Sequence, residues 1–236
     1  MEKKNKLKMK QFLKTNLIFL VLVIFDGLVI TAHYLLKNKY GFFDLDGEGN
    51  LNSAYSGLKL LFIGGLVLFQ FLILHKTKDK LKKRLVWLLT AASFIYLGTD
   101  EMMAIHERAG FVFNNLLGVS NSDGASFNWI IYFSPLIALA LLVYSGFIIY
   151  SWQKNIIAGV WLLAGTLLLI AGLAIEALSG QVVYPRGLVT RDFSLYFKFI
   201  IIEEVVELVG ASCFLTGVWH SVKNDFYTHF KVDSQE

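Results

Sequence analysis

Six apolar runs, each about long enough to cross a membrane, dominate this chain. They lie near residues 15–36, 55–76, 85–107, 128–151, 156–179 and 196–222. A helix of roughly 20 apolar residues spans the ~30 Å hydrocarbon core of a bilayer and satisfies its own backbone N–H and C=O groups there. The runs predict an all-α fold, a polytopic membrane helical bundle with about six transmembrane helices.

The composition agrees with this interpretation. Of the 236 residues, 56% are hydrophobic and 17% are charged, whereas about a quarter of the residues of a soluble domain are charged. The first run is too long for a cleaved signal peptide. We expect a basic cytoplasmic N-terminal segment (1–14), a six-helix transmembrane domain (15–222) and a cytoplasmic C-terminal tail (223–236).

The basic residues predict the orientation. With the N-terminus inside, fifteen of the 22 Lys and Arg residues flank the cytoplasmic ends of the runs and six lie outside. The positive-inside rule then favours an N-in/C-in arrangement, as a multi-pass protein of the cell membrane. The net charge of +4 belongs to these flanks, so the expected partner is the lipid bilayer and not a nucleic acid.

Acidic residues gather on the opposite side. Twelve of the eighteen Asp and Glu residues fall in outer loops or outer helix halves. In the last run, Glu203, Glu204 and Glu207 occupy one arc of about 100° within some 6 Å of rise. Ionised carboxylates this close repel one another, so they require protons, a cation or a basic partner. Because ionisable residues inside a membrane are costly, we predict an outward-facing acidic site.

The third run supplies the other half of this site. In a continuous helix, Asp100 and Glu107 share a face, and Glu101 and His106 flank it on opposite sides. We predict that a divalent cation or shared protons neutralise the acidic residues of both runs, with a purely structural salt-bridge network as the alternative; the expected cation ligands are Asp100, Glu101, His106, Glu107, Glu203, Glu204 and Glu207. His106 and Glu107 are also the candidate catalytic residues, because either can act as a general base.

The ligand chemistry leaves the identity of the cation open. Carboxylates with one imidazole suit zinc, manganese or non-haem iron, and an all-oxygen shell suits calcium. The His106-Glu107 pair lacks the second histidine of the zinc-protease helix motif. The chain also has no Glu-x-x-His pair of the di-iron type.

Two further groups of polar residues are candidates. Asp26 lies in the middle of the first run, where a lone charge must face protein or water, and we assign it with Glu176 to an auxiliary polar core. In the first outer loop, Asp44, Asp46 and Glu48 match the first ligand positions of an EF-hand, but the twelfth position is Tyr55. This loop, with Asn50, either binds calcium, contributes to the main site or forms a solvated turn.

Taken together, these motifs resemble a family of uncharacterised bacterial multipass membrane proteins. The resemblance covers residues 40–218 and rests on Asp-x-Asp-x-Glu-x-Asn at 44–50, Ser56, Asp100-Glu101 with His106-Glu107, Glu176, and Glu203-Glu204-x-x-Glu207 followed by Gly210. It implies that these acidic positions form the pattern of the family, and it implies no particular activity.

Three functions fit the sequence. The first is a metal-dependent, membrane-embedded hydrolase or lipid-modifying enzyme at the outer leaflet. The second is a cation- or proton-coupled transporter or channel, with Asp26 as a deeper step. The third is a non-catalytic membrane module that binds a cation. A lipid or an ion is the expected substrate, and the sequence does not set the oligomeric state.

Overall fold

Helices account for all the regular structure in the described part of the chain. The computed structural model describes residues 2–45, 49–75, 81–118, 129–183 and 193–232, with side chains for 15–45, 49–72, 84–118, 129–178 and 198–226. The six long helices are α1 (Glu2–Leu36), α2 (Leu51–His75), α3 (Leu81–Met103), α5 (Trp129–Lys154), α6 (Ile156–Val183) and α7 (Phe193–Val232). Two short elements, η1 (Gly41–Phe43) and α4 (Ile105–Leu116), complete them. The predicted all-α class is confirmed for these residues.

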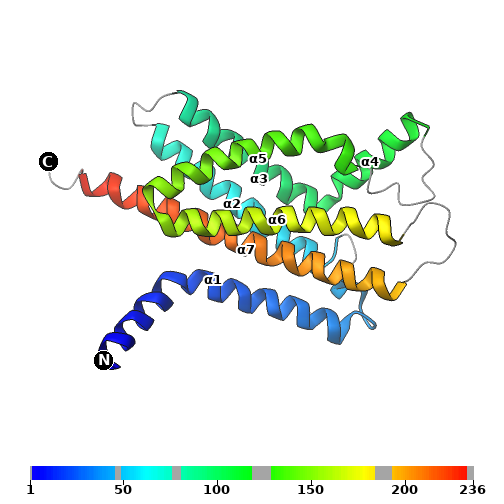
Figure 1. The fold of residues 1–236 in the computed structure, drawn as a ribbon, viewed down its shortest axis with the longest axis horizontal. Helices are drawn as coiled ribbons and strands as arrows, with labels where there is room; N and C mark the ends of the chain where they lie inside the picture. The colour runs from blue at the N-terminus through cyan, green and yellow to red at the C-terminus, as the bar shows by residue number, and fades with distance from the viewer. Residues whose placement is uncertain (1, 46–48, 76–80, 119–128, 184–192, 233–236) are drawn as a thin grey trace.

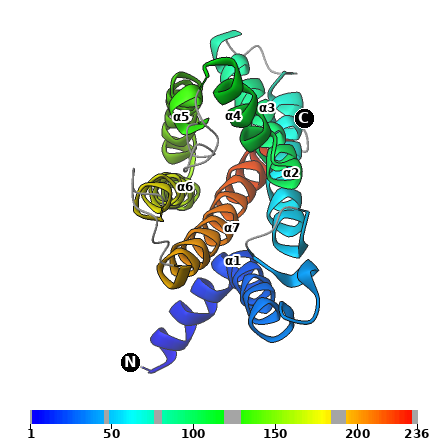
Figure 2. The same ribbon diagram turned by 90° about the vertical axis from the view of Figure 1, so that its right-hand side faces the viewer.

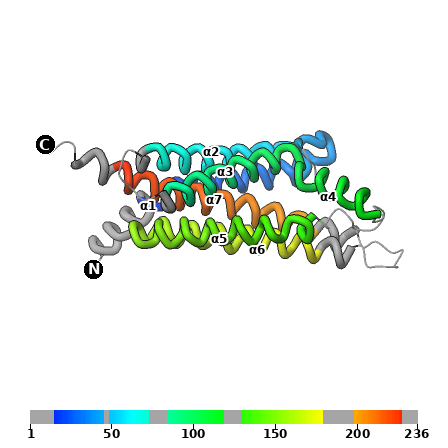
Figure 3. The backbone as a smooth tube through the Cα atoms, turned by 90° about the horizontal axis from the view of Figure 1, so that it is seen from above, coloured from blue at the N-terminus to red at the C-terminus, as the bar shows by residue number. Residues whose placement is uncertain are grey.

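The long helices run side by side as an elongated bundle (Figure 1). Helix α1 begins and helix α7 ends at the same end, which we call the terminal end; η1 and α4 lie at the opposite, distal end (Figures 1 and 3). Helix α7 lies in the middle of the bundle (Figure 2) and contacts α1, α2, α5 and α6. Any group on the inner faces of α7 therefore meets side chains from several helices.

Four helical segments are long and apolar enough to cross a membrane: Thr15–Leu36, Leu51–Leu72, Trp129–Lys154 and Ile156–Leu178. Large apolar side chains cover their outer surfaces, among them Leu17, Ile24 and Phe25 on α1 and Ile131, Leu139 and Leu142 on α5. Lipid tails can solvate such a surface and water cannot. The described helices are consistent with a helical membrane bundle.

Helices α2 and α3 approach each other closely at glycines. A Cβ atom added to Gly57 of α2 would lie 2.7 Å from the backbone oxygen of Gly98, and one added to Gly98 of α3 would lie 2.7 Å from the backbone oxygen of Gly57. Small residues at such crossings are typical of membrane helices, where close backbone contact drives association. The crossing brings the polar distal turns of α2 and α3 together.

Glycines also allow helices α6 and α7 to approach each other closely. A Cβ atom added to Gly217 of α7 would lie 2.9 Å from the backbone nitrogen of Leu162 on α6. Nearer the distal end, a Cβ atom on Gly172 of α6 would lie 3.2 Å from Oε1 of Glu207. The absence of a side chain at Gly172 therefore leaves the space that the Glu207 carboxylate fills.

Aromatic packing fills the centre of the bundle. The ring of Phe94 on α3 lies 5.2 Å from that of Tyr144 on α5 and 5.0 Å from that of Phe214 on α7, measured between centroids. All three side chains are buried. Nearer the terminal end, Gln70 of α2 donates hydrogen bonds to Ser221 and Asp225 of α7. An apolar layer therefore separates this polar cluster from the distal end.

The third predicted run, 85–107, is not one continuous helix. Helix α3 ends at Met103, and Ala104 adopts a left-handed conformation (φ 48°, ψ 46°) before α4 begins. For a residue with a Cβ atom this conformation costs about 1–2 kcal/mol. The Asp100 carboxylate offsets part of that cost, because it accepts a hydrogen bond of 2.7 Å from the backbone N–H of His106. The break changes which side chains of this segment can meet.

We expect Gly57→Ala to lower the thermal unfolding midpoint by several degrees, because its Cβ atom would push the α2 and α3 backbones apart. Gly65→Ala on the same helix is the matched control. A Cβ atom at Gly65 meets nothing within 4 Å, so the alanine should raise stability by about 0.5–1 kcal/mol through helix propensity. Melting of the detergent-solubilised protein measures both changes. Equal midpoints for the two variants would contradict the close crossing.

Candidate functional site

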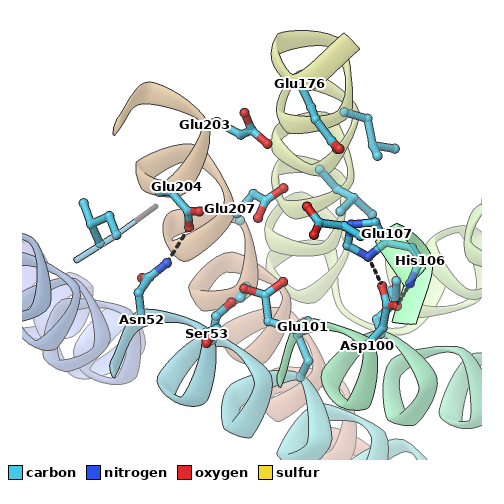
Figure 4. A pocket seen from close by; sticks show the side chains of 18 of the residues that line it. Asn52, Ser53, Asp100, Glu101, His106, Glu107, Glu176, Glu203, Glu204 and Glu207 are labelled. Atoms are coloured by element: carbon cyan, nitrogen blue, oxygen red, sulfur yellow. Dashed lines mark hydrogen bonds and ion pairs between the residues drawn. The ribbon is translucent and has the colours of Figure 1, made fainter. Parts of the chain in front are cut away.

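Acidic residues of four helices, α3, α4, α6 and α7, converge on one cavity of about 330 Å³ at the distal end (Figure 4). Its polar lining consists of Asn52, Ser53, Ser56, Asp100, Glu101, His106, Glu107, Glu176, Glu203, Glu204 and Glu207, with the indole of Trp129. The structure therefore brings together all seven residues that we predicted as cation ligands, and it adds Glu176. Their roles remain predictions.

Three carboxylates form the tightest group. One oxygen each from Glu101, Glu204 and Glu207 lies within 4.8 Å of the other two. Three points at that spacing lie about 2.8 Å from a common centre, close to the 2.3–2.6 Å of a calcium–oxygen bond. A small inward movement of the side chains would let all three contact one ion. We refer to Glu101, Glu204 and Glu207 as the carboxylate trio.

Asn52 of α2 extends the trio. Its Nδ2 donates a hydrogen bond to Glu204 Oε2, whereas its Oδ1 has no hydrogen-bond partner among the described residues. The side chain is only 2% exposed and lines the cavity. A buried amide oxygen without a donor is costly. Sequence reasoning missed this residue, because an Asn in the first turn of a helix usually serves the helix end.

Asp100 and His106 form a hydrogen-bonded pair beside the trio. His106 Nδ1 lies 2.8 Å from Asp100 Oδ2, and the backbone N–H of His106 is held by Asp100 Oδ1. The imidazole ring packs 4.3 Å from that of Trp129, centroid to centroid. With Nδ1 engaged by Asp100, Nε2 is the ring nitrogen left to act on a ligand. The break at Ala104 brings Asp100 and His106 together, because an unbroken helix would place the two residues on different faces.

The remaining acidic residues surround these two groups. Glu176 of α6 accepts a hydrogen bond of 2.7 Å from Trp129 Nε1 of α5. Glu107 is exposed and Glu203 is half-buried. In Figure 4 the carboxylates of Glu101, Glu107 and Glu207 point toward the middle of the cavity. Glu107 therefore faces the trio from the side of α4.

Asp26 belongs to a separate, closed cluster. Its Oδ1 lies 2.9 Å from Lys59 Nζ, and its Oδ2 accepts a hydrogen bond of 2.7 Å from Ser212 Oγ. Lys59 Nζ also donates to the backbone oxygen of Leu208 at 2.8 Å and lies 4.5 Å from the centre of the Tyr55 ring. None of Asp26, Lys59 and Ser212 lines the cavity. The cluster joins α1, α2 and α7.

The described candidate ligands of the first outer loop lie beside the site, although the apolar Leu45 of this loop lines the cavity. Asp44 Oδ1 is 3.5 Å from His33 Nδ1, and Asn50 caps α2 by accepting a hydrogen bond of 2.8 Å from the Ser53 N–H. Neither Asp44 nor Asn50 lines the cavity. Asp46 and Glu48 lie outside the described residues, so their predicted part in a calcium site stays a prediction.

Comparison with known proteins places the chain in a family. The profile of the family described as Domain of unknown function (DUF8692) matches residues 16–221. The chain belongs to this family, which fits the resemblance to an uncharacterised family. Neither the curated proteins nor the solved structures give a match.

We expect Lys59→Met to destabilise the protein by roughly 3–5 kcal/mol, because Asp26 would stay buried without its charge partner. The double variant Asp26→Leu with Lys59→Met should recover most of this loss, since no lone charge remains. Unfolding titrations of both variants in mixed micelles give the two free energies. A double variant as unstable as Lys59→Met would show that the two charges do not compensate each other.

Proposed function

We propose that this protein is a membrane-embedded, cation-dependent hydrolase whose site is the distal cavity. The observation that carries the proposal is the carboxylate trio, three oxygens from two helices within 4.8 Å of one another. Carboxylates so arranged favour a divalent cation, which relieves their mutual repulsion. The cation would supply Lewis acidity and activate a water molecule.

The trio favours a hard cation. It offers oxygen ligands alone, and Nδ1 of His106 is engaged by Asp100. Carboxylate and amide oxygens suit manganese, calcium or magnesium, whereas zinc and iron sites usually include imidazole or thiolate. Of the cations expected from the sequence, manganese and calcium fit this ligand set best.

The Asp100–His106 pair supports hydrolysis over simple cation binding. A carboxylate that holds Nδ1 of a histidine fixes the tautomer and orientation of the ring, so that Nε2 can take a proton from water. Asp100 is then a positioning residue, and His106 is the general base. Glu107, which faces the same cavity, is the alternative base.

Packing below the cavity argues against transport through the bundle. Phe94, Phe214 and Tyr144 close the cavity toward the terminal end, and Ile63 and Val67, further along α2, are 0% exposed. Along α2 the polar residues Lys59 and Gln70 are separated by eleven positions, or about 16 Å of helix. The described polar groups of this layer are single hydroxyls, such as those of Thr90, Thr216 and Tyr144, and no buried charged side chain is described there, so a function on one side of the membrane fits better.

The proposed orientation places the cavity at the outer face of the cell membrane. Helix α3 has 23 residues and α7 has 40, so at 1.5 Å per residue both exceed a ~30 Å bilayer core. With the four apolar spans they would give six crossings. The basic flanks at the terminal end would then be cytoplasmic.

We expect purified protein to bind one manganese or calcium ion per chain, and saturating ion to raise the unfolding midpoint, because a ligand at 100 times its Kd stabilises by ~2.7 kcal/mol. Glu204→Gln and Glu207→Gln should abolish both effects. Glu107→Gln, in the same cavity but outside the trio, is the control. Elemental analysis measures the bound ion, and melting curves measure the unfolding midpoint. No bound ion and an unmoved midpoint would refute the cation site.

We expect His106→Gln to lower the hydrolysis rate of a medium-chain ester such as 4-nitrophenyl octanoate by 10²–10⁴-fold, the usual contribution of a general base. Asp100→Asn should lower it less, since it misorients the ring without removing it. Both variants should still bind the ion, which elemental analysis checks. A wild-type rate in His106→Gln would assign the base to another group, and Glu107→Gln tests the alternative directly.

A further inference from the structure

The cavity changes from polar to apolar in the same direction on four helices. Seven positions along each helix separate a polar residue near the mouth from an apolar residue at the inner end, in the pairs Ser53 and Leu60, Glu101 and Phe94, Glu176 and Leu169, and Glu207 and Phe214. Seven residues of helix rise about 10.5 Å. The cavity therefore has an acidic mouth above an apolar floor.

The floor is built from side chains that offer no hydrogen bond to a ligand. Phe94 and Phe214 contact each other there, and Leu97, Leu173 and Ala211 line the wall above them. Water makes few favourable contacts in such a space. A hydrocarbon chain, in contrast, gains about 0.8 kcal/mol of binding free energy for each methylene group that it buries there. The 10.5 Å of helix rise between the polar and apolar positions corresponds to about eight carbons of an extended chain, at roughly 1.3 Å per carbon.

The charged residues at the cavity mouth determine which charge a ligand's polar group can carry. The lining contains seven carboxylates and one imidazole, and no Lys or Arg among the described residues. Even with a divalent cation bound, the remaining carboxylates would repel an anion. In contrast, an amide or ammonium N–H can donate hydrogen bonds to these carboxylates.

We propose that the cavity takes a single-chain amphiphile whose head group carries no negative charge. The head, an amide, ester or amine, lies among the carboxylates and Asn52, and the first eight or so carbons of the tail lie against Phe94 and Phe214. This inference rests on the proposed function, because the amphiphile would be the substrate of that hydrolysis. The binding of the amphiphile itself does not require the cation.

The test is a binding series on the cation-treated full-length protein in detergent. The probes are octylamine, octanamide and octanoate, which share a chain length and differ in head charge, and butylamine, which shortens the tail. Ala211→Phe and Leu173→Phe place an aromatic ring just above the floor and are called the floor variants; Ala138→Phe on the exposed face of α5 is the control. Ratios of variant to wild-type affinity cancel the partition of each probe into detergent.

Octylamine and octanamide should bind at least tenfold more tightly than octanoate. Each floor variant should weaken octylamine at least tenfold and butylamine less than twofold, and the control should change neither. Equal weakening of both amines, or tightest binding of octanoate, would overturn the proposal. Because ion binding is measured separately by elemental analysis, loss of the cation site and loss of the amphiphile site are distinguishable.

Discussion

Charged groups in this bundle lie where the dielectric constant is low, and each group needs compensation within reach. The molecule meets this constraint in two ways. Asp26 and Lys59 neutralise each other, and Ser212 and the Leu208 carbonyl complete their hydrogen bonds. Nearer the distal end, the carboxylate trio gathers like charges, which a cation can compensate. The first arrangement is closed and suits a structural role, whereas the second leaves room for an added ion.

The Asp26–Lys59 ion pair and the carboxylate trio are connected through contacts between α2 and α7. Asn52, Ser56 and Lys59 lie on one buried face of α2, spaced as successive helical turns require. Asn52 binds Glu204, and Lys59 binds the carbonyl of the residue that follows Glu207. These contacts fix the rotation of α7 about its own axis, so the ion pair also determines the direction in which Glu204 and Glu207 point.

Sequence patterns predicted the six long helices because each contains a long apolar run, but they did not predict α4 as a separate helix. They predicted the acidic residues of α7 because Glu203, Glu204 and Glu207 share a helical arc. They could not predict the pairing of Asp100 with His106, which needs a left-handed Ala104 that no local residue type signals. Nor could they pair Asp26 with Lys59 or Asn52 with Glu204. These partners are 33 and 152 positions apart, and only the packing of α1, α2 and α7 brings them together.

The trio also explains why the cavity exists between these particular helices. Helix α3 packs on α2 and α5, and α7 packs on α2 and α6, so α2 lies between the two helices that carry the trio. At the floor, Phe94 and Phe214 bridge α3 and α7 directly. At the mouth, the corresponding bridge is the set of three carboxylates, which repel one another when all are ionised. An ion held there would join α3 to α7 at the end where these apolar contacts do not.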